Sequence, residues 1–292
     1  MDPRLQQVTI LHCLQHSGGW DRNASFDPMF QPVRIARSLG FDPPARAEHV
    51  IRFMMGKPLD FDPGTRYAYS NYGYCLLGRV IEARSGLKYD QYVKQHVLAP
   101  VGVRQMRIGR TMLEDRAPRE VRYYDELQRT GRSVFAKNLD EKVPAPYGAW
   151  YLEAMDSHGA WIASARDLVR FAAALDQPAK SPLLKEASIR RMFARPAGVL
   201  GHDDQQQPKV VYYGCGWSVR TLPGKPTVNT WHTGSLDGTS TILVRRHDGL
   251  NWAVLFNTRN GTNNHRLSTM IDGRVHQAAD AVQQWPDRDL QR

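Results

Sequence analysis

A chain of 292 residues is long for one domain and short for two, and a chain of this size can bury about 75% of its unfolded surface, so we expect one large core. Hydrophobic residues make up 41% of the chain and charged residues 23%, values typical of a globular domain, which excludes a disordered chain. No repeat of about 20 to 50 residues indicates a solenoid or propeller, and no apolar stretch approaches the ~20 residues of a membrane span.

The charge balance is basic, because 39 Lys and Arg residues oppose 29 Asp and Glu residues, for a net charge of +10. Such a balance can indicate an anionic partner such as nucleic acid, lipid headgroups or a cell-wall polymer. The densest basic pairs are Arg190-Arg191 and Arg245-Arg246, and the arginines of residues 104–132 are interleaved with acidic side chains. Because nucleic-acid faces cluster their charge, we predict a solvated surface of mixed charge and no nucleic-acid partner.

The residue types that bind metals or form disulfides are scattered. The cysteines are three in number and lie far apart among apolar neighbours, which predicts buried thiols rather than a disulfide framework: Cys13, Cys75 and Cys215. His12 and His16 are four residues apart, a spacing that can bind a metal from one helix face, but no third ligand is near them in the sequence. We expect packing or capping roles for both, and a solvated loop at His202-Asp203-Asp204. The sequence predicts no metal and no cofactor.

In the first half of the chain, a helix is predicted over residues 8–15, ending at Ser17-Gly18-Gly19, where glycine supplies the left-handed conformation of a helix end. A second helix is predicted directly after the turn Tyr69-Ser70-Asn71, with apolar residues at helical spacing as far as Ser85-Gly86. A third covers residues 89–98. Residues 104–151 are rich in charge and aromatic side chains, and we expect an irregular insert near the substrate cleft, because loops of this length are often functional.

In the second half, Ser164 and Asp167 form a capping-box-like pair, and apolar residues at helical spacing predict a helix after them. Residues 239–245 and 252–257 are rich in β-forming side chains and are joined by His247-Asp248-Gly249, which indicates a hairpin. A long amphipathic helix is predicted over residues 267–282. Antiparallel strands with helices around them predict a mixed α/β (α+β) fold.

Two short motifs point to function. Tyr69-Ser70-Asn71 follows Pro63-Gly64-Thr65 and precedes Leu77-Gly78, and His232-Thr233-Gly234 follows Trp231. In this order and setting they resemble the second and third active-site motifs of serine hydrolases related to class C β-lactamases, D,D-peptidases and esterases. The stretch from Ile10 to Gly19 and the helix after Ser164 also resemble segments of that family. The resemblance covers nearly the whole chain and implies a single domain, residues 1–292, with an antiparallel sheet flanked by helices.

The resemblance implies a role for each motif residue. Tyr69 would be the general acid/base that moves the proton between nucleophile and leaving group, although a phenol of pKa ~10 is a poor base at neutral pH unless a neighbouring lysine and His232 stabilise the phenolate. Asn71 would bind the substrate amide or acyl side chain. The substrate-binding triplet would be His232-Thr233-Gly234, with Gly234 leaving room for substrate beside the strand. The backbone N–H of Ser235 would be one of two oxyanion-hole donors.

The family's first motif, Ser-x-x-Lys, carries the nucleophile and should come before Tyr69, and it is not in this sequence. Ser85-Gly86-Leu87-Lys88 fits the pattern, but it follows Tyr69 and lies at a helix end, so we interpret it as a surface turn. The sequence starts just before the Ile10 segment, and we therefore expect the early strands and the Ser-x-x-Lys helix of the fold to be missing from this chain. Its stability alone would be doubtful.

Three hypotheses follow. The first is the C-terminal part of an active serine hydrolase that takes a small-molecule or peptide acyl substrate. The second is a catalytically inactive binding module of the same fold, and the third is an unrelated basic binding protein, which would need a clustered positive face. We rank ester or peptide-like substrates before β-lactams, because His232 stands where many relatives carry lysine. No obligate partner is predicted. Relatives are often exported, but no signal peptide is recognised and the compartment stays open.

Overall fold

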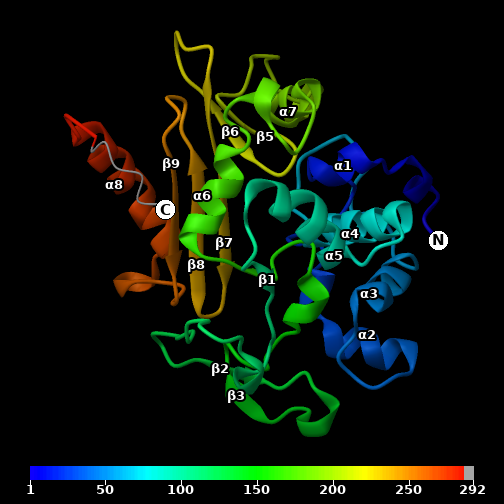
Figure 1. Ribbon diagram of the computed structural model, residues 1–292. Coiled ribbons are helices and arrows are strands. Elements are labelled where there is room, and N and C mark those ends of the chain that lie inside the picture. The colour runs from blue at the N-terminus through cyan, green and yellow to red at the C-terminus, as the bar shows by residue number, and fades with distance from the viewer. Residues whose placement is uncertain (286–292) are drawn as a thin grey trace.

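The computed structural model describes residues 1–285, and these form a five-stranded antiparallel sheet with helices on both faces (Figure 1). The strand order is β5-β6-β7-β8-β9, so each strand pairs with its neighbour in the sequence. The bounds are Val211–Tyr213 for β5, Ser218–Thr221 for β6, Val228–Leu236 for β7, Thr239–Arg245 for β8 and Asn251–Phe256 for β9. The predicted antiparallel sheet flanked by helices is therefore confirmed.

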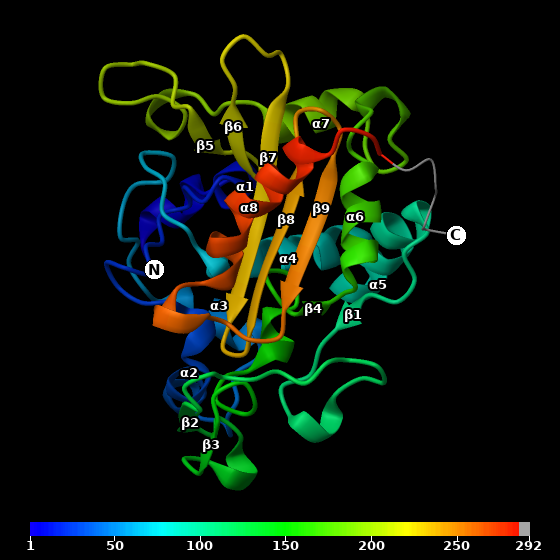
Figure 2. The ribbon, with the colours of Figure 1, turned by 90° about the vertical axis from the view of Figure 1, so that its left-hand side faces the viewer.

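Helices α6 and α8 cover opposite faces of this sheet (Figures 1 and 2). Helix α6 (Ala165–Ala173) accepts a hydrogen bond from Arg245 at the carbonyl of Ala172, whereas α8 (Leu267–Ala281) donates its Ser268 N–H to Ser240. Side chains alternate between the two faces along a strand, so Ser240 and Arg245 of β8 point to opposite sides. On β7, His232 pairs with Leu243 on the α6 face, and Trp231 pairs with Val244 on the α8 face.

The remaining helices form a second layer beside the α6 face of the sheet (Figure 1). Their core is one large buried cluster that includes Trp20, Ile35, Val50, Cys75 and Met155. A smaller cluster of Leu175, Ile189 and Trp217 joins α6 and α7 to the sheet. The bounds of these helices are Ile10–Leu14 for α1, Pro32–Leu39 for α2, Ala47–Met54 for α3, Asn71–Ser85 for α4, Tyr89–Val93 for α5 and Glu186–Phe193 for α7.

Helix α4 starts and ends where its sequence signals place it. The Ser70 hydroxyl accepts a hydrogen bond from the Gly73 N–H at the N-terminus, and Gly86 adopts a left-handed conformation with φ of 72° at the C-terminus. The predicted helices at residues 8–15, 89–98 and 267–282 correspond to α1, to α5 with a π-helical turn, and to α8. Ser164 caps α6 by accepting the Asp167 N–H, as predicted.

Residues 104–151 contain little regular structure and lie at one end of the molecule, below the sheet in Figure 2. A short hairpin pairs β2 (Thr130–Arg132) with β3 (Lys142–Pro144), and β1 (Arg107–Ile108) pairs with β4 (Trp161–Ile162). The N–H of Tyr124 donates to the carbonyl of Asn257, just beyond β9, so this segment reaches the end of the sheet. Its role as an insert that shapes a cleft stays a prediction.

Candidate active site

The turn before α4 fixes the backbone around Tyr69. The N–H of Ala68 donates to the carbonyl of His16 at 2.8 Å, and the N–H of Ser70 donates to His16 Nδ1 at 3.1 Å. Tyr69 therefore lies between two hydrogen-bonded neighbours and directly before the helix cap. Its own side chain is part-buried beside the sheet.

Strand β7 brings His232 to the same place. The rings of Tyr69 and His232 have centroids 6.4 Å apart, although the two residues are far apart in the sequence. His232 Nε2 is 2.9 Å from the hydroxyl of Tyr213 on β5, which holds the imidazole in position. The structure thus brings together the first residues of the two motifs that the sequence indicates.

His16 lies at the centre of an aromatic cluster behind Tyr69. Its ring centroid is 4.2 Å from that of Tyr69, 4.6 Å from that of Tyr213 and 5.0 Å from that of Tyr74. Because Nδ1 accepts the Ser70 N–H, the neutral ring carries its proton on Nε2, which has no partner within the described part of the chain. Burial lowers the pKa of His16 to about 3, with the nearby His232 adding to the effect, so the ring is uncharged at neutral pH.

Burial and a nearby cation shift the pKa of the Tyr69 phenol in opposite directions. Burial raises the pKa of the Tyr69 phenol, the positive charge of Arg22 lowers it and the carboxylate of Asp27 raises it further. The Arg22 guanidinium carbon is 4.9 Å from the centroid of the Tyr69 ring. His232 contributes no positive charge at neutral pH, because burial lowers the pKa of its imidazole.

Asn71, the first residue of α4, is oriented by a carboxylate. Its Nδ2 donates to Asp27 Oδ2 at 2.6 Å, and the other Asp27 oxygen accepts the N–H of Met29 at 3.1 Å. With the amide nitrogen turned to Asp27, the carbonyl oxygen of Asn71 is left for other partners. Burial raises the pKa of the Asp27 carboxyl, while the bond from Asn71 opposes this rise.

The three residues after His232 divide between the two faces of β7. Gly234 pairs with Thr241 on the face of His232, and a Cβ at position 234 would stand 2.4 Å from Thr241 Oγ1, so a larger residue would displace the Thr241 hydroxyl. Thr233 and Ser235 point to the other face. The Ser235 hydroxyl accepts a hydrogen bond from Arg259 Nε at 3.1 Å.

A cavity of about 220 Å³ opens where β7 ends. Ser235 and Arg259 form one side, and Arg259 is paired with Asp237 at 3.0 Å. The aromatic side chains of Trp150 and Phe30 also line the cavity. The cavity is therefore adjacent to the backbone that the sequence assigned to the oxyanion hole, and it combines apolar walls with a hydrogen-bonding serine and an arginine.

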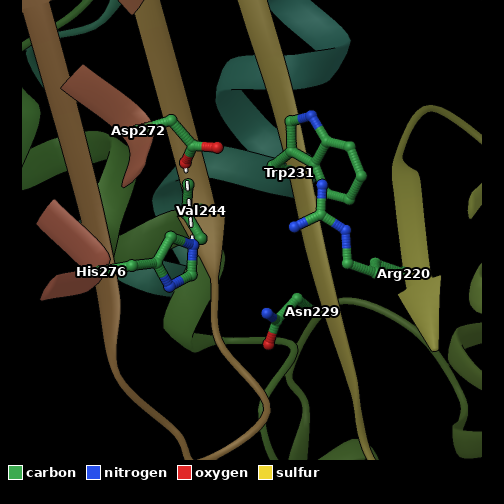
Figure 3. A pocket seen from close by; sticks show the side chains of 6 residues that line it. All are labelled: Arg220, Asn229, Trp231, Val244, Asp272 and His276. Atoms are coloured by element: carbon green, nitrogen blue, oxygen red, sulfur yellow. Dashed lines mark ion pairs between the residues drawn. The ribbon is translucent and has the colours of Figure 1, made fainter. Parts of the chain in front are cut away.

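A second, far smaller pocket lies on the α8 face of the sheet, away from His232 (Figure 3). Its volume of about 10 Å³ leaves no room for a substrate. His276 Nε2 and Asp272 of α8 are 3.7 Å apart there, facing the strand residues Trp231 and Val244 (Figure 3). The candidate site is therefore the region of Tyr69 and His232 on the α6 face.

The residues described by the structure contain no group of three His, Cys, Asp or Glu side chains that could hold a metal ion. His12 instead caps α1 through reciprocal bonds with Thr9. No helix among residues 1–285 is long and apolar enough to cross a membrane.

Comparison with known proteins identifies the family. The Beta-lactamase family model matches residues 2–275, and the chain belongs to this family. It is 26% identical over 262 residues to penicillin-binding protein 4* of Bacillus subtilis (strain 168), which covers 83% of this chain and 49% of that protein. It is 30% identical over 183 residues to a probable fimbrial assembly protein, FimD, of Dichelobacter nodosus, covering 62% and 40%. The chain thus spans about half the length of the curated relatives it matches, or less.

Solved structures show the same fold. A D-amino acid amidase from Ochrobactrum anthropi SV3 has a TM-score of 0.67 at 20% identity, covering 96% of this chain and 74% of that one. A penicillin binding protein from Bacillus halodurans has a TM-score of 0.65 at 20% identity, covering 94% and 74%. At these identities the likeness shows the fold alone. Together with the family match it makes this chain a member of the serine hydrolase fold of β-lactamases and penicillin-binding proteins.

Sequence reasoning missed three residues that the structure places at the site. Arg22 and Asp27 follow the Ser17-Gly18-Gly19 turn, and Tyr213 lies on β5; none belongs to a motif. Their importance comes from contacts with Tyr69, Asn71 and His232 respectively. The one signal available was position, since Arg22 and Asp27 lie within ten residues after a segment that resembles the family.

Proposed function

We propose that this chain carries the acid/base and substrate-binding part of a serine hydrolase that cleaves ester, amide or β-lactam acyl bonds through an acyl-enzyme. The observation that carries the proposal is the proximity of Tyr69 and His232 in a chain of the Beta-lactamase family. The centroids of their rings are 6.4 Å apart. The serine nucleophile and its lysine would come from sequence outside these 292 residues.

In this proposal Tyr69 moves the proton. A phenolate beside a serine hydroxyl takes its proton during attack on the acyl carbon and then gives a proton to the leaving group. The Tyr213 hydroxyl and His232 Nε2, 2.9 Å apart, provide a polar edge that can stabilise the changing charge on the Tyr69 oxygen. The backbone hydrogen bonds of Ala68 and Ser70 to His16 hold this segment still during the transfer.

The binding residues surround that centre. The carbonyl oxygen of Asn71, with its amide nitrogen held by Asp27, would accept a hydrogen bond from a substrate N–H. The Ser235 N–H would contribute to the oxyanion hole, and the 220 Å³ cavity beyond Ser235 would receive a compact part of the substrate. His232 is uncharged at neutral pH, which favours esters and amides over substrates that need a cation at this position.

A second candidate is a binding module without turnover. It is favoured by the sequence itself, in which the Ser-x-x-Lys match is Ser85 to Lys88. The Ser85 hydroxyl donates to the carbonyl of Ile81 at the end of α4, beside the left-handed Gly86, so it is a helix-end residue and no nucleophile. A chain with a formed cleft and no nucleophile would bind acyl compounds without cleaving them.

The test uses the full-length protein from its native gene and measures hydrolysis of an ester and of an amino-acid amide. Tyr69→Phe should lower kcat by about 100-fold or more, because general acid/base groups contribute that much. Tyr67→Phe is the control, since Tyr67 lies two residues away and also contacts the His16 ring. Binding without turnover in the unaltered protein would favour the binding module. Unchanged kcat in Tyr69→Phe would show that Tyr69 has no acid/base role.

A further inference from the structure

Arg22 is placed over Tyr69, and its positive charge also acts on the carboxyl of Asp27. Its guanidinium carbon lies 4.9 Å from the centroid of the Tyr69 ring. The side chain is exposed and stacks on Tyr69, and within residues 1–285 its N–H groups form no ion pair or hydrogen bond. A guanidinium over an aromatic ring is attracted by the partial negative charge on the face of the ring. The attraction is stronger when the tyrosine is ionised, because a phenolate carries a full negative charge.

The loop that carries Arg22 is fixed by the residue before it. The Asp21 N–H donates to Asp60 Oδ2 at 2.7 Å, and the Asp21 carboxylate accepts from the N–H of Asn23 and pairs with Arg66 at 3.0 Å. Gly19, with φ of 106°, turns the chain into this loop in a conformation that other residues rarely adopt. The backbone under Arg22 is therefore anchored, so the guanidinium does not depend on its own hydrogen bonds for its position.

The other groups around Tyr69 supply no positive charge at neutral pH. The pKa values of His16 and His232 are lowered by burial, and His16 titrates at about 3. The tyrosines that face the site have raised pKa values and are neutral: Tyr67, Tyr74 and Tyr213. Asp27 acts in the opposite direction, since its negative charge opposes a phenolate at Tyr69. Among the groups facing the phenol, Arg22 is the permanent cation.

We propose that Arg22 is the positioning residue of Tyr69, holding the ring by its face and supplying the positive charge that favours the phenolate. The importance of this role rests on the proposed acid/base function of Tyr69. The interaction itself belongs to residues 1–285 and needs no nucleophile. It also places a charge-supplying residue in the loop after Gly19, outside the two motifs that the sequence indicates.

The experiment measures the chemical reactivity of Tyr69 in this chain. Tetranitromethane nitrates phenolates, so the nitration rate at pH 8 follows the phenolate fraction. Trypsin releases Tyr69 within residues 67–79, and fragmentation in the mass spectrometer separates it from Tyr67, Tyr72 and Tyr74. Tyr124, which is 55% exposed and distant in sequence, serves as the reference for reagent activity.

Three variants are compared with the unaltered chain. A unit charge about 5 Å from a phenol, even when screened as in water, changes the ratio of phenolate to phenol by roughly fourfold. We therefore expect Arg22→Gln to slow nitration of Tyr69 about fourfold or more, and Arg22→Lys to keep most of the rate. Arg34→Gln is the matched control, because Arg34 also stacks at 4.9 Å, on the ring of Phe26, and should leave the rate unchanged.

A nitration rate of Tyr69 that does not fall in Arg22→Gln would overturn the proposal. If Arg22 only covers the ring, Arg22→Gln uncovers Tyr69 and nitration stays equal or becomes faster, which overturns the proposal. A circular dichroism spectrum identical to that of the unaltered chain excludes unfolding as the cause of a change, and Arg22→Lys gives a second reading if the glutamine variant is unstable. Failure of the full-length protein to hydrolyse acyl compounds, with the nitration effect present, would remove the proposed function and leave the Arg22 interaction standing.

Discussion

Gly78 lies in the middle of α4, and the structure predicts that an alanine there destabilises the protein despite being the better helix former. A Cβ at this position would stand 2.4 Å from Ser157 Oγ and 2.6 Å from Ser157 Cβ. The Ser157 hydroxyl cannot simply turn away without loss, because it donates to the carbonyl of Tyr74 at 2.9 Å. Helix α4 also begins at Asn71, so a shift of this helix would disturb the candidate site.

The balance of terms gives the sign and the size. Alanine gains about 0.8–1 kcal/mol over glycine in a helix interior. Overpacking costs about 1–3 kcal/mol, and loss of the Ser157 hydrogen bond costs about 1 kcal/mol more. We expect Gly78→Ala to lower the free energy of unfolding by about 1–3 kcal/mol.

Gly273 in α8 is the matched control. A Cβ there meets no atom within 4 Å, so Gly273→Ala should raise the free energy of unfolding by up to about 1 kcal/mol. Urea unfolding, followed by circular dichroism in the helix band at about 222 nm, gives the free energy of unfolding of both variants. If helix propensity alone decided the outcome, both alanines would raise this free energy. Adding Ser157→Gly to Gly78→Ala should recover part of the loss. A Gly78→Ala protein as stable as the unaltered chain would refute the reasoning.

Three further outcomes are expected. Burial lowers the pKa of His158 from 6.5 to about 4, so the unfolded chain takes up the proton first and stability falls as pH drops through this window, by up to about 1.4 kcal/mol per pH unit. His158→Leu should flatten that slope in urea titrations at several pH values, and identical slopes would contradict the account. Asp176→Ala leaves the largely buried Arg245 without its carboxylate and should cost about 2–3 kcal/mol; an unchanged unfolding midpoint would argue against this. Asp27→Ala frees the Asn71 amide, and kcat/KM for an amide substrate in the full-length protein should fall roughly tenfold with the fold intact, whereas an unchanged value would show that Asp27 does not orient Asn71.

The elements with local signals were predictable from the sequence. Ser70 and Gly86 mark both ends of α4, and Ser164 marks the start of α6, because capping depends on residues within one turn of the helix. The turn at residues 247–249 identified the β8–β9 hairpin for the same reason. Strands β5 to β7 had no such signal. Strand β5 has only three residues, and β7 carries Thr233, Gly234 and Ser235 in a row, which interrupts the alternation of apolar and polar residues that indicates a strand.

The candidate site was predictable only at the residues that belong to a motif. Tyr69 and His232 were found by resemblance, and the structure brings them together. Arg22, Asp27 and Tyr213 act on them through contacts between segments far apart in the sequence, and no spacing rule connects such segments. The same holds for the cavity beside Ser235, which depends on how Trp150 and Phe30 pack against the end of β7.

The most direct test of the central claim is the intact mass of the protein isolated from the cells that make it, before and after reaction with a fluorophosphonate probe. The proposed function predicts a species heavier than 33.2 kDa that gains one adduct, with the modified serine mapping outside residues 1–292. A species of 33.2 kDa that gains no adduct would contradict it, and Tyr69, Asn71 and His232 would then be binding residues in a protein without hydrolase activity.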